Sequence, residues 1–493
     1  MKAPNYGDES PIAAFATSYG NSALTLIRCS GKDSIRLISS VFSSSKLNDA
    51  PGNTVVHGWI TAGNEKIDEV LVSVFRAPKS YTGEDSLDIC CHGGISTGKA
   101  VMDVLKNAGF RDALPGEFTF RAFMNGKIDL TKSESVMEIV SAKTDKGRQH
   151  AVSRLLGSLE KEINEIKTLL VQVLAGAEIY LDYSEDEISA EFDASASDEI
   201  AGRLPGKEIA QEVLARIKKL SNSWKLERIY QEGVMVVIAG CPNAGKSSLF
   251  NMLLKEERSI VTEVPGTTRD WIEAFVSIDG IPIRLIDTAG LREASDSVEK
   301  IGVERSRKML QDADIVLYLI DGEQGITNED KDFLALHSGS GENHATYGVP
   351  SPAGTLPKTG SCYLFVWNKA DITPAPEGYI AVSAKTGEGL QELYSAITSA
   401  ITSAVSVSGE VPSVTHGGVS LGSASLGTER QKKLIDSASY VLEEALILAE
   451  REEPLDIIAP LIREAVSSLG EITGEVSTAD ILEEMFSRFC VGK

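Results

Sequence analysis

Residues 240–248 have the types and spacing of a loop that binds phosphate groups. An apolar run from Val234 to Ala239 precedes Gly240, four further residues and Gly245-Lys246-Ser247. Glycines let backbone N–H groups curl around phosphate oxygens, and the following helix adds the positive end of its dipole. We expect Lys246 to reach the β- and γ-phosphates and the Ser247 hydroxyl to bind Mg²⁺. A glycine turn without function explains many isolated matches, but three further nucleotide motifs follow here in order.

These later motifs predict that the nucleotide is GTP. In Asp287-Thr288-Ala289-Gly290, Asp287 would hold Mg²⁺ through water and the Gly290 N–H would sense the γ-phosphate. Thr268 would close onto Mg²⁺ when that phosphate is present. In Asn368-Lys369-Ala370-Asp371, Asp371 would accept two hydrogen bonds from guanine, and adenine could not satisfy that buried carboxylate. Ser383-Ala384-Lys385 would close the base pocket. The predicted GTP-binding residues are Asn243, Ala244, Gly245, Lys246, Ser247, Ser248, Thr262, Thr267, Thr268, Asp287, Thr288, Ala289, Gly290, Asn368, Lys369, Asp371, Ser383, Ala384 and Lys385.

The hydrolysis residues must differ from those of small signalling GTPases. These carry Gln after the Asp-x-x-Gly motif to orient water, whereas Leu291 occupies that place here. A substitute could come from the acidic residues of the loop 291–302, namely Glu293, Asp296 and Glu299. The γ-phosphate also needs positive charge. As a hypothesis, potassium takes the place of an arginine finger, held by Asn243 and by oxygens of Thr262, Val264 and Thr267.

The composition restricts the class of partner. A net charge of −23 argues against a broad grip on a nucleic-acid backbone, so a nucleic-acid role needs a local patch or a more basic partner. No apolar stretch is long enough to span a bilayer, and the first residues do not lead into a signal-peptide core. The six cysteines are scattered, which favours a reducing cytosol.

The patterning predicts several domains. Residues 1–130 indicate an α+β domain, 131–230 and 428–493 indicate helices, and 231–403 indicate a doubly wound α/β unit. The Gly/Ser/Pro-rich segments 337–362 and 404–427 indicate a surface insertion and a linker. The strands expected in the α/β unit are Val234–Ala239, Trp271–Ile278, Ile281–Ile286, Ile315–Ile320, Tyr363–Trp367 and Ile380–Val382. One apolar stripe on a helix is expected at Leu155, Leu159, Ile163, Ile166, Leu170 and Val173.

Two groups of residues outside the nucleotide motifs could also carry chemistry. Glu84, Arg121 and Lys127 lie in loops rich in glycine and aromatic residues. They are either solvated charges or part of a small-molecule pocket. Cys490 lies near the end of the chain beside apolar residues, where it is either part of a frayed tail or a reactive thiol.

The chain resembles the MnmE (TrmE) family of tRNA-modification GTPases over nearly its whole length. The stretches that carry the resemblance are S-Y-T-G-E-D with C-H-G-G, P-G-E-F-T-F-R-A-F-M-N-G-K-I-D-L, G-C-P-N-A-G-K-S-S-L-F-N, P-G-T-T-R-D, D-T-A-G-L-R-E and the terminal F-C-V-G-K. The resemblance implies a cytoplasmic homodimer with an N-terminal folate-binding domain, a discontinuous helical domain and an inserted Ras-like P-loop GTPase domain.

The resemblance also implies partners and cofactors. The flavoprotein MnmG (GidA) would supply FAD, form a heterotetramer with the homodimer and hold most of the tRNA. The complex would modify the wobble uridine of certain tRNAs at the 5-position, in a carboxymethylaminomethyl-type product, with a one-carbon unit from 5,10-methylene- or 5-formyl-tetrahydrofolate.

Individual residues match family positions. The family's folate contacts are matched by Arg28, Glu84, Lys127 and Lys493, and its potassium site by Asn243, Thr262, Val264 and Thr267. The magnesium ligands are matched by Ser247 and Thr268. Glu299 matches the acid that positions water, and Cys490 matches the cysteine implicated in the modification.

Two functions of different classes are therefore compatible with the sequence. The favoured one is a potassium-dependent GTP hydrolase, with Glu299, Lys246 and Cys490 as catalytic residues, which acts in tRNA modification. The alternative is a regulatory GTPase that binds the ribosome or a membrane through an N-terminal interaction module. Folate binding to residues 1–130 separates the two.

Overall fold

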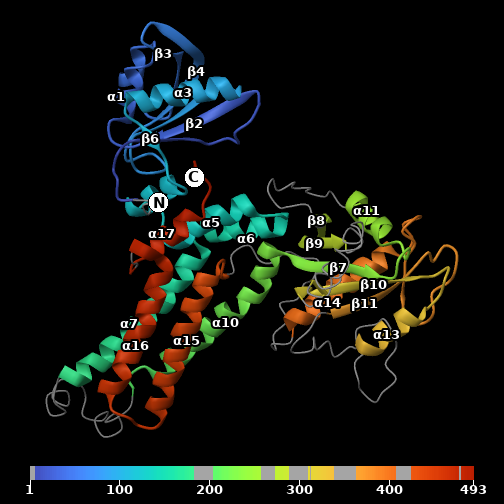
Figure 1. The fold of residues 1–493 in the computed structure, drawn as a ribbon. Helices are drawn as coiled ribbons and strands as arrows, with labels where there is room; N and C mark the ends of the chain where they lie inside the picture. The colour runs from blue at the N-terminus through green and yellow to red at the C-terminus, as the bar shows by residue number, and fades with distance from the viewer. Residues whose placement is uncertain are drawn as a thin grey trace, which may run out of the picture. The chain divides into compact units, whose positions relative to one another are not determined.

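The computed structural model describes residues 6–182, 204–256, 272–287, 309–310, 312–337, 362–406, 424–476 and 479–492. Its elements are drawn in Figure 1. The chain divides into two compact units. Unit 1 comprises Met1–Met137, Leu155–Leu214 and Lys433–Lys493, and unit 2 comprises Glu138–Arg154 and Ala215–Lys432.

A six-stranded sheet forms the N-terminal part of unit 1. The strand order is β3-β4-β5-β2-β1-β6, and the pairs are antiparallel except β1 with β6. Side chains along β4 alternate between buried and more exposed positions, as expected for a sheet with one face in the core. α3 (Ile95–Ala108) lies over the sheet (Figure 1), and its buried apolar residues share one core with the strands. The strands are β1 (Ile12–Phe15), β2 (Leu24–Ser30), β3 (Thr54–Ala62), β4 (Glu65–Phe75), β5 (Ser86–His92) and β6 (Arg111–Asp112).

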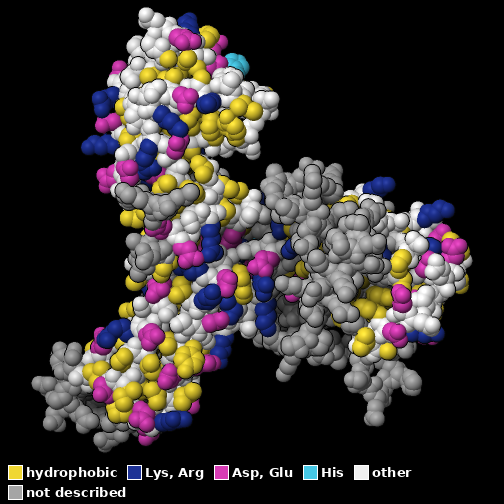
Figure 2. All heavy atoms as spheres, viewed as in Figure 1, with side chains coloured by type: hydrophobic (Ala, Val, Ile, Leu, Met, Phe, Trp, Pro, Cys, Tyr) yellow, Lys and Arg dark blue, Asp and Glu magenta, His cyan; other side chains and the backbone are white. Residues whose placement is uncertain are grey.

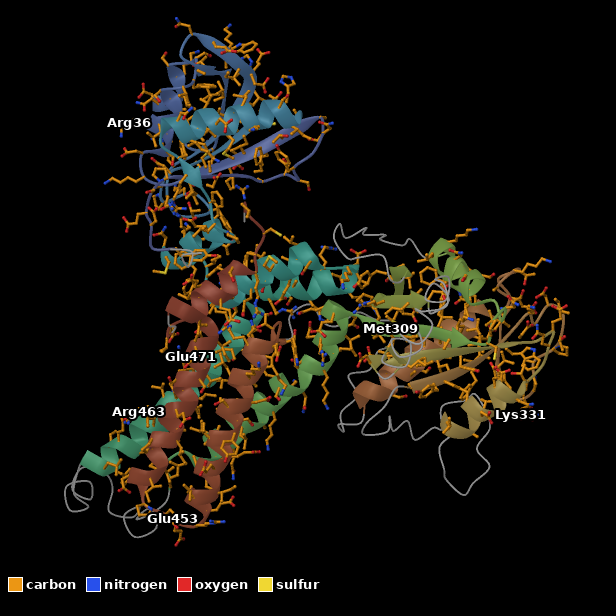
Figure 3. The ribbon with its side chains drawn as sticks, in the orientation of Figure 1. Arg36, Met309, Lys331, Glu453, Arg463 and Glu471 are labelled. Atoms are coloured by element: carbon orange, nitrogen blue, oxygen red, sulfur yellow. The ribbon has the colours of Figure 1, made fainter. Side chains whose placement is uncertain are left out.

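Long helices form the rest of unit 1. α7 (Ser158–Asp182) and α16 (Leu455–Thr473) lie side by side. Arg463, labelled in Figure 3, lies on α16 and donates to Glu178 on α7 at 2.5 Å. The predicted stripe is buried on α7 at Leu159, Ile163, Ile166, Leu170 and Val173.

The start of the predicted stripe is wrong. Leu155 does not belong to α7 but ends α6 (Asp145–Leu155). The helix cannot continue, because Gly157 has a φ of +93°. Among the described residues, the other helices with residues in unit 1 are α1 (Ser34–Ser39), α2 (Lys46–Asp49), α4 (Glu117–Met124), α5 (Leu130–Ser141), α10 (Lys207–Glu232), α15 (Glu429–Glu450) and α17 (Ala479–Ser487).

Unit 2 contains the predicted doubly wound sheet. The order is β12-β11-β10-β7-β9-β8, and all pairs are parallel except β8 with β9. The hairpin between β8 and β9 turns at Asp279 and Gly280, both with positive φ, as a two-residue type I′ turn requires. The strands are β7 (Val234–Gly240), β8 (Ile272–Ile278), β9 (Ile281–Asp287), β10 (Ile315–Asp321), β11 (Cys362–Asn368) and β12 (Ile380–Ala381). All six predicted strands are confirmed, each end within one residue.

Helices cover both faces of this sheet. Leu249 and Leu253 of α11 (Lys246–Glu256) and Leu393 and Ile397 of α14 (Leu390–Ser406) belong to one apolar core. Leu334 of α13 (Asn328–His337) belongs to a second core, with residues from the other face of the strands. In this order β7 and β10 are neighbours, but the chain continues from β7 to β8 and β9 on one side and from β10 to β11 on the other. Ligands of such sheets bind at the carboxyl ends of the strands beside this point of divergence.

A buried group of charged residues in unit 2 joins helices to the segment 424–427. We call Glu138, His150, Arg154, Glu227 and Ser425 the Arg154 cluster. Arg154 is 1% exposed and donates to Glu138 Oε2 at 2.6 Å, to Glu227 Oε2 at 2.9 Å and to Ser425 Oγ at 2.9 Å. His150 Nδ1 lies 2.5 Å from Glu227 Oε1. Glu227 belongs to α10, which leads into β7, and Ser425 lies just before α15.

Some predictions fall outside the described residues, among them most of the insertion 337–362 and most of the linker 404–427. Among the residues that are described, no helix combines the length and the apolar composition needed to cross a membrane.

Candidate functional site

The phosphate-binding loop between β7 and α11 depends on two glycines. Gly240 has a φ of +139°, and a Cβ there would lie 2.3 Å from the Leu319 carbonyl oxygen of β10. Gly245 has a φ of +90°, and a Cβ there would lie 2.1 Å from Asn368 Nδ2. Conformation disfavours a side chain at both positions; at Gly240 the backbone also excludes it, and at Gly245 the Asn368 side chain would have to move. The loop is therefore packed directly on β10 and on the residue that ends β11.

Lys246 lies over the start of this loop. Its ammonium donates to the carbonyl oxygens of Gly240 and Cys241, at 3.0 and 2.8 Å. Phosphate oxygens would compete with these carbonyls for the donors of the ammonium group.

The two motifs assigned to magnesium meet at the ends of neighbouring elements. Ser247 Oγ, in the first turn of α11, donates to Asp287 Oδ2 at 2.8 Å. Asp287 ends β9 and is 1% exposed. Magnesium prefers oxygen ligands, so a hydroxyl beside a buried carboxylate fits this ion, bound directly or through water.

Asn368 connects the phosphate-binding loop to the predicted base pocket. Its side chain is buried, donates to the Ala244 carbonyl at 2.7 Å and accepts from the Ala384 N–H at 3.0 Å. Lys369 pairs with Asp321 at 2.8 Å and with Glu323 at 3.1 Å. The residues predicted for phosphate and for guanine are therefore brought together.

One assumption about the base pocket is wrong. The carboxylate of Asp371 was expected to be buried, but Asp371 is exposed, as is Lys385. The loop after β11 leaves both side chains at the surface of the protein, so only a bound base could remove them from water.

Nine predicted site residues lie outside the described residues. They are Thr262, Val264, Thr267, Thr268, Thr288, Ala289, Gly290, Glu299 and Lys493. Of the predicted potassium ligands, the structure thus places Asn243, which has a φ of +65° and is exposed in the phosphate-binding loop.

In the N-terminal sheet, Arg28 pairs across two strands. Arg28 on β2 and Asp88 on β5 are direct partners in register, and the guanidinium forms two hydrogen bonds with the carboxylate, at 3.0 and 3.2 Å. Burial lowers the pKa of Arg28, but the hydrogen bond and charge of Asp88 outweigh it and raise the pKa above its usual value. Arg28 therefore presents a fixed positive charge on this sheet.

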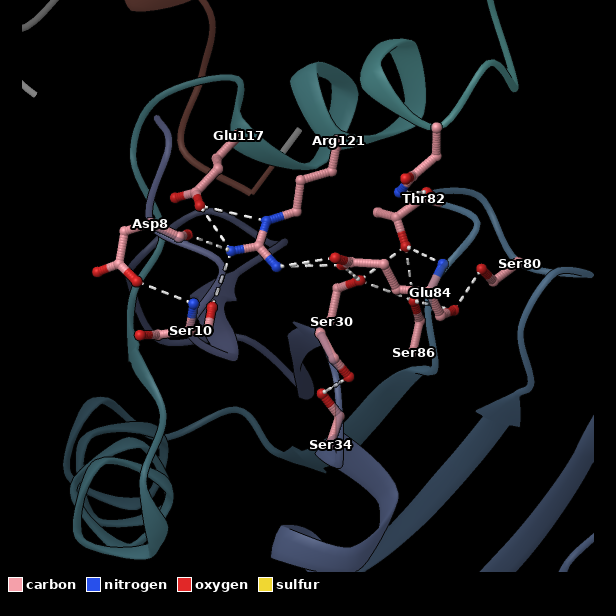
Figure 4. Close-up of polar contacts among 12 residues, drawn as sticks. Asp8, Ser10, Ser30, Ser34, Ser80, Thr82, Glu84, Ser86, Glu117 and Arg121 are labelled. Atoms are coloured by element: carbon pink, nitrogen blue, oxygen red, sulfur yellow. Dashed lines mark hydrogen bonds and ion pairs between the residues drawn. The ribbon is translucent and has the colours of Figure 1, made fainter. Parts of the chain in front are cut away.

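Glu84 is held by a buried arginine. Arg121 on α4 is 6% exposed, and its Nη1 lies 3.2 and 3.1 Å from the two carboxylate oxygens of Glu84 (Figure 4). The same guanidinium pairs with Glu117, which is fully buried. Ser30 Oγ donates to Glu84 Oε2 at 2.9 Å. These contacts fix the orientation of the Glu84 carboxylate.

Lys127 contacts the same loop as Glu84. Its ammonium donates to the Pro78 carbonyl at 2.9 Å, and its side chain lies beside Gly83. The segment 78–88 therefore connects the described residues predicted for folate. It contains Glu84, its Pro78 carbonyl accepts from Lys127, and its Asp88 pairs with Arg28.

The carboxyl-terminal tail of the chain lies against the N-terminal sheet. The Gly116 N–H donates to the Cys490 carbonyl at 3.3 Å, and Arg28 Nη1 donates to the Gly492 carbonyl at 3.5 Å. Gly492 has a φ of +94°, and a Cβ there would lie 2.4 Å from the Phe15 carbonyl oxygen. Cys490 is exposed. The terminal motif and Arg28 therefore meet, although 464 positions separate Gly492 from Arg28.

Two family models match the chain. The N-terminus of the GTP-binding protein TrmE matches residues 11–127, and the MnmE helical domain matches residues 130–490. The tRNA modification GTPase MnmE of Treponema denticola is 40% identical over 501 residues, with 100% of both chains covered. The chain belongs to the MnmE family.

A second relative agrees with this membership. MnmE of Borreliella burgdorferi (strain ZS7) is 39% identical over 500 residues and covers 98% of both chains. The G domain of the FeoB iron transporter of T. maritima is 27% identical, covers 34% of this chain and 98% of its own, and has a TM-score of 0.24. That score is too low to carry an argument.

The predicted family, fold class and enzyme class are confirmed. This MnmE-family chain has an N-terminal TrmE domain with its α+β sheet, an MnmE helical domain and a P-loop GTPase fold with a doubly wound sheet. As a member of a family named for its GTPase activity, it is a GTP hydrolase.

Sequence reasoning left the setting of one residue of the N-terminal site open and missed another. Arg121 was expected to be a loop charge or a pocket residue, yet it is buried and orients Glu84. Asp88 was not singled out, although a carboxylate inside the apolar strand Leu87–Cys91 was a signal, because such a charge needs a partner. That partner is Arg28.

Proposed function

We propose that the chain is a potassium-dependent GTP hydrolase that acts with the flavoprotein MnmG in tRNA modification. The complex modifies the wobble uridine of certain tRNAs at the 5-position, using a tetrahydrofolate one-carbon unit to form a carboxymethylaminomethyl-type product. The relatives that match the full chain are named tRNA modification GTPases, which supports the coarser part of this proposal.

The observation that carries the proposal is the position of Asn368. Its two amide contacts join the loop predicted to bind phosphate, at Ala244, to the loop predicted to bind the base, at Ala384. One nucleotide would therefore contact both loops. Asp371 supplies the selectivity for guanine, because a bound base would cover this exposed carboxylate and guanine offers it two donors that adenine lacks.

Magnesium and potassium have separate roles in this proposal. Ser247 and Thr268 are the magnesium ligands, and Asp287 holds the ion through water. Asn243, with Thr262, Val264 and Thr267, holds potassium. Bound cations would stabilise the negative charge that develops on the phosphates during hydrolysis. Glu299 positions the attacking water, and Lys246 binds the β- and γ-phosphates.

The folate derivative is assigned to the N-terminal domain. Arg28 and Lys127 supply positive charge, the oriented Glu84 carboxylate accepts hydrogen bonds, and Lys493 is the residue after Gly492, which contacts Arg28. Cationic side chains suit the glutamate carboxylates of a folate. The contact of the tail with Arg28 brings Cys490 to this domain, where we assign it to the modification chemistry.

The assembly is proposed as a cytoplasmic homodimer that forms a heterotetramer with MnmG, the carrier of FAD. On the face shown in Figure 2, acidic and basic side chains of the described residues are interspersed. Together with the net charge of −23, this supports a tRNA held mainly by MnmG. The domain boundaries at residues 130, 230, 403 and 428 belong to the same proposal.

Wobble-nucleoside analysis of tRNA from cells that lack the chain tests the function. We expect the modified nucleoside to be lost and to return with the wild-type chain. A Cys490→Ser chain is expected to hydrolyse GTP normally without restoring it. Unchanged wobble nucleosides in the deleted strain would contradict the proposal.

Two measurements on the purified chain test potassium and folate independently. GTP turnover should be higher in KCl than in NaCl at the same ionic strength, and equal turnover would remove potassium from the proposal. Calorimetry with 5-formyl-tetrahydrofolate should give saturable heat. Folded protein without that heat would favour a regulatory GTPase that binds the ribosome or a membrane.

A further inference from the structure

A buried carboxylate outside the nucleotide motifs contacts the phosphate-binding loop. Asp330 lies in the first turn of α13 and is 1% exposed. Its Oδ1 lies 3.1 Å from the Sγ of Cys241, the second residue of the loop. We propose that Asp330 is a positioning residue for nucleotide binding, which holds the start of the loop through the Cys241 thiol. This inference rests on the proposed binding of GTP.

The helix cap accounts for only one oxygen of Asp330. Asp330 Oδ2 accepts from the Thr327 N–H at 2.9 Å and from Thr327 Oγ1 at 2.7 Å, and Thr327 Oγ1 accepts from the Asp330 N–H at 3.2 Å. This is a reciprocal cap of α13, and Asp330 takes part in it only through Oδ2 and its N–H. Oδ1 accepts from Cys241 and from the Tyr318 hydroxyl, at 3.1 and 2.9 Å. A capping residue alone would not need these contacts.

The protonation states suit a thiol donor and a carboxylate acceptor. Burial and the contact with Asp330 raise the pKa of Cys241, so the sulfur keeps its proton. Burial raises the pKa of Asp330, but hydrogen bonds from Thr327, Cys241 and Tyr318 outweigh it and lower the pKa below its usual value. An ionised carboxylate only accepts hydrogen bonds. Asparagine at this position would turn an NH₂ group toward one of the two pairs of donors.

The hydrogen bond from Cys241 to Asp330 holds the part of the backbone that the phosphates would contact. Gly240 packs against the Leu319 carbonyl, and the next residue is tied to Asp330. The carbonyl oxygens of these two loop residues are the ones that contact Lys246. If the thiol contact is lost, the loop must be ordered when nucleotide binds, and affinity falls by that cost.

Titration of the full-length chain with a fluorescent GDP analogue tests the inference. Cys241→Ala removes the donor but leaves the cap of α13 intact. We expect it to weaken binding about two- to tenfold, the effect of one lost hydrogen bond, with an unchanged melting temperature. Cys241→Ser restores a donor and should restore affinity. Asp330→Asn should weaken binding by a similar factor and also lower the melting temperature, because it disturbs the cap.

The control and the double variant show whether affinity depends on the hydrogen bond from Cys241 to Asp330 or only on local packing. Glu329→Gln makes the same change at the neighbouring residue, whose carboxylate lies 3.6 Å from the same sulfur at the surface, and should leave binding unchanged. Cys241→Ala combined with Asp330→Asn should bind no more weakly than the weaker single variant.

Three outcomes would overturn the inference alone: wild-type affinity in Cys241→Ala and Asp330→Asn, a Cys241→Ser variant as weak as Cys241→Ala, or additive losses in the double variant. A wild-type chain that does not bind the GDP analogue would overturn the proposed function and this inference with it.

Discussion

At the scale of single residues, Gly245 and Gly325 have similar backbones but different surroundings. Their φ angles are +90° and +72°. A Cβ at Gly245 would lie 2.1 Å from Asn368 Nδ2, whereas a Cβ at Gly325 would have no atom within 4 Å. The pair therefore separates the cost of a left-handed conformation from the cost of a collision in the site.

We expect Gly245→Ala to weaken GDP binding by more than about tenfold, because Asn368 must give up its contact with Ala244 to make room. Gly325→Ala should cost about 1–2 kcal/mol of stability and leave GDP affinity unchanged. A fluorescent GDP analogue measures the affinity and thermal unfolding measures the stability. Equal affinities for the two variants would contradict the role given to Asn368.

The sequence predicts the types of the site residues better than their contacts. Gly240, Gly245, Lys246 and Ser247 follow from a local motif, because one loop contains them all. The partners of Asn368 and the exposure of Asp371 depend on how separate loops meet, which spacing along the chain does not encode. Thr268 and Glu299 lie outside the described residues, so their roles stay predictions.

At the scale of elements, the Arg154 cluster connects α5, α6 and α10 through buried charges. Arg154 compensates two buried carboxylates, those of Glu138 and Glu227. We expect Arg154→Leu to lower the free energy of unfolding of this region by about 3–5 kcal/mol, because it removes the buried guanidinium that pairs with both carboxylates. Hydrogen exchange of peptides from α6 and α10 measures the loss.

Arg228→Ala is the matched control for Arg154→Leu. Arg228 lies on the same helix as Glu227, but its pair with Glu232 is exposed to solvent. Such pairs contribute about 0–1 kcal/mol, so exchange should change little. Similar exchange in both variants would show that the buried pairs do not stabilise the region.

The same cluster should make stability depend on pH. Burial raises the pKa of Glu227, but the hydrogen bond from His150 and the charges of Arg154 and His150 outweigh it and lower the pKa below the usual value of 4.5. A carboxylate with a lowered pKa in the folded state stabilises the protein above its unfolded pKa. That stabilisation is lost as pH falls below about 4.5 toward the folded pKa.

We therefore expect exchange in α6 and α10 to accelerate as pH falls below 4.5. Glu227→Gln should reduce this acceleration, because the amide does not titrate, although the variant is less stable at neutral pH. Rates must be corrected for the intrinsic pH dependence of exchange. An equal pH dependence in both proteins would remove Glu227 as the titrating group.

Element types were predictable where the pattern is long and regular. The six strands of unit 2 were placed within one residue, because the buried parallel strands are continuous apolar runs and the Asp279-Gly280 turn separates the antiparallel pair β8 and β9. Leu155 was misplaced because its spacing continues the stripe of α7 although Gly157 ends the helix before it. Apolar spacing predicts a buried face, but it does not show where one helix ends and the next begins.

At the scale of the whole molecule, the chain places its last residues against its first strands. The Phe15 backbone excludes any side chain at Gly492, and Phe486 and Phe489 pack in a cluster with Tyr6. No local pattern predicts a contact between ends so far apart in sequence; only the family resemblance implied it, by grouping Lys493 with Arg28. The tail is therefore the strongest link between the terminal cysteine motif and the proposed folate site.

Gly492→Ala tests that link. The new Cβ would collide with the Phe15 carbonyl, so the tail must leave the sheet and Arg28 loses its contact with the Gly492 carbonyl. We expect calorimetry with 5-formyl-tetrahydrofolate to show affinity lowered by about tenfold or more, the effect of a lost charge-assisted contact. GTP turnover should stay at the wild-type level, because the phosphate-binding loop belongs to unit 2. Val491→Ala changes an exposed neighbour that is 53% accessible and should titrate like the wild type. If Gly492→Ala also titrates like the wild type, the tail is not part of the folate site, and Cys490 loses its assigned place beside the one-carbon carrier.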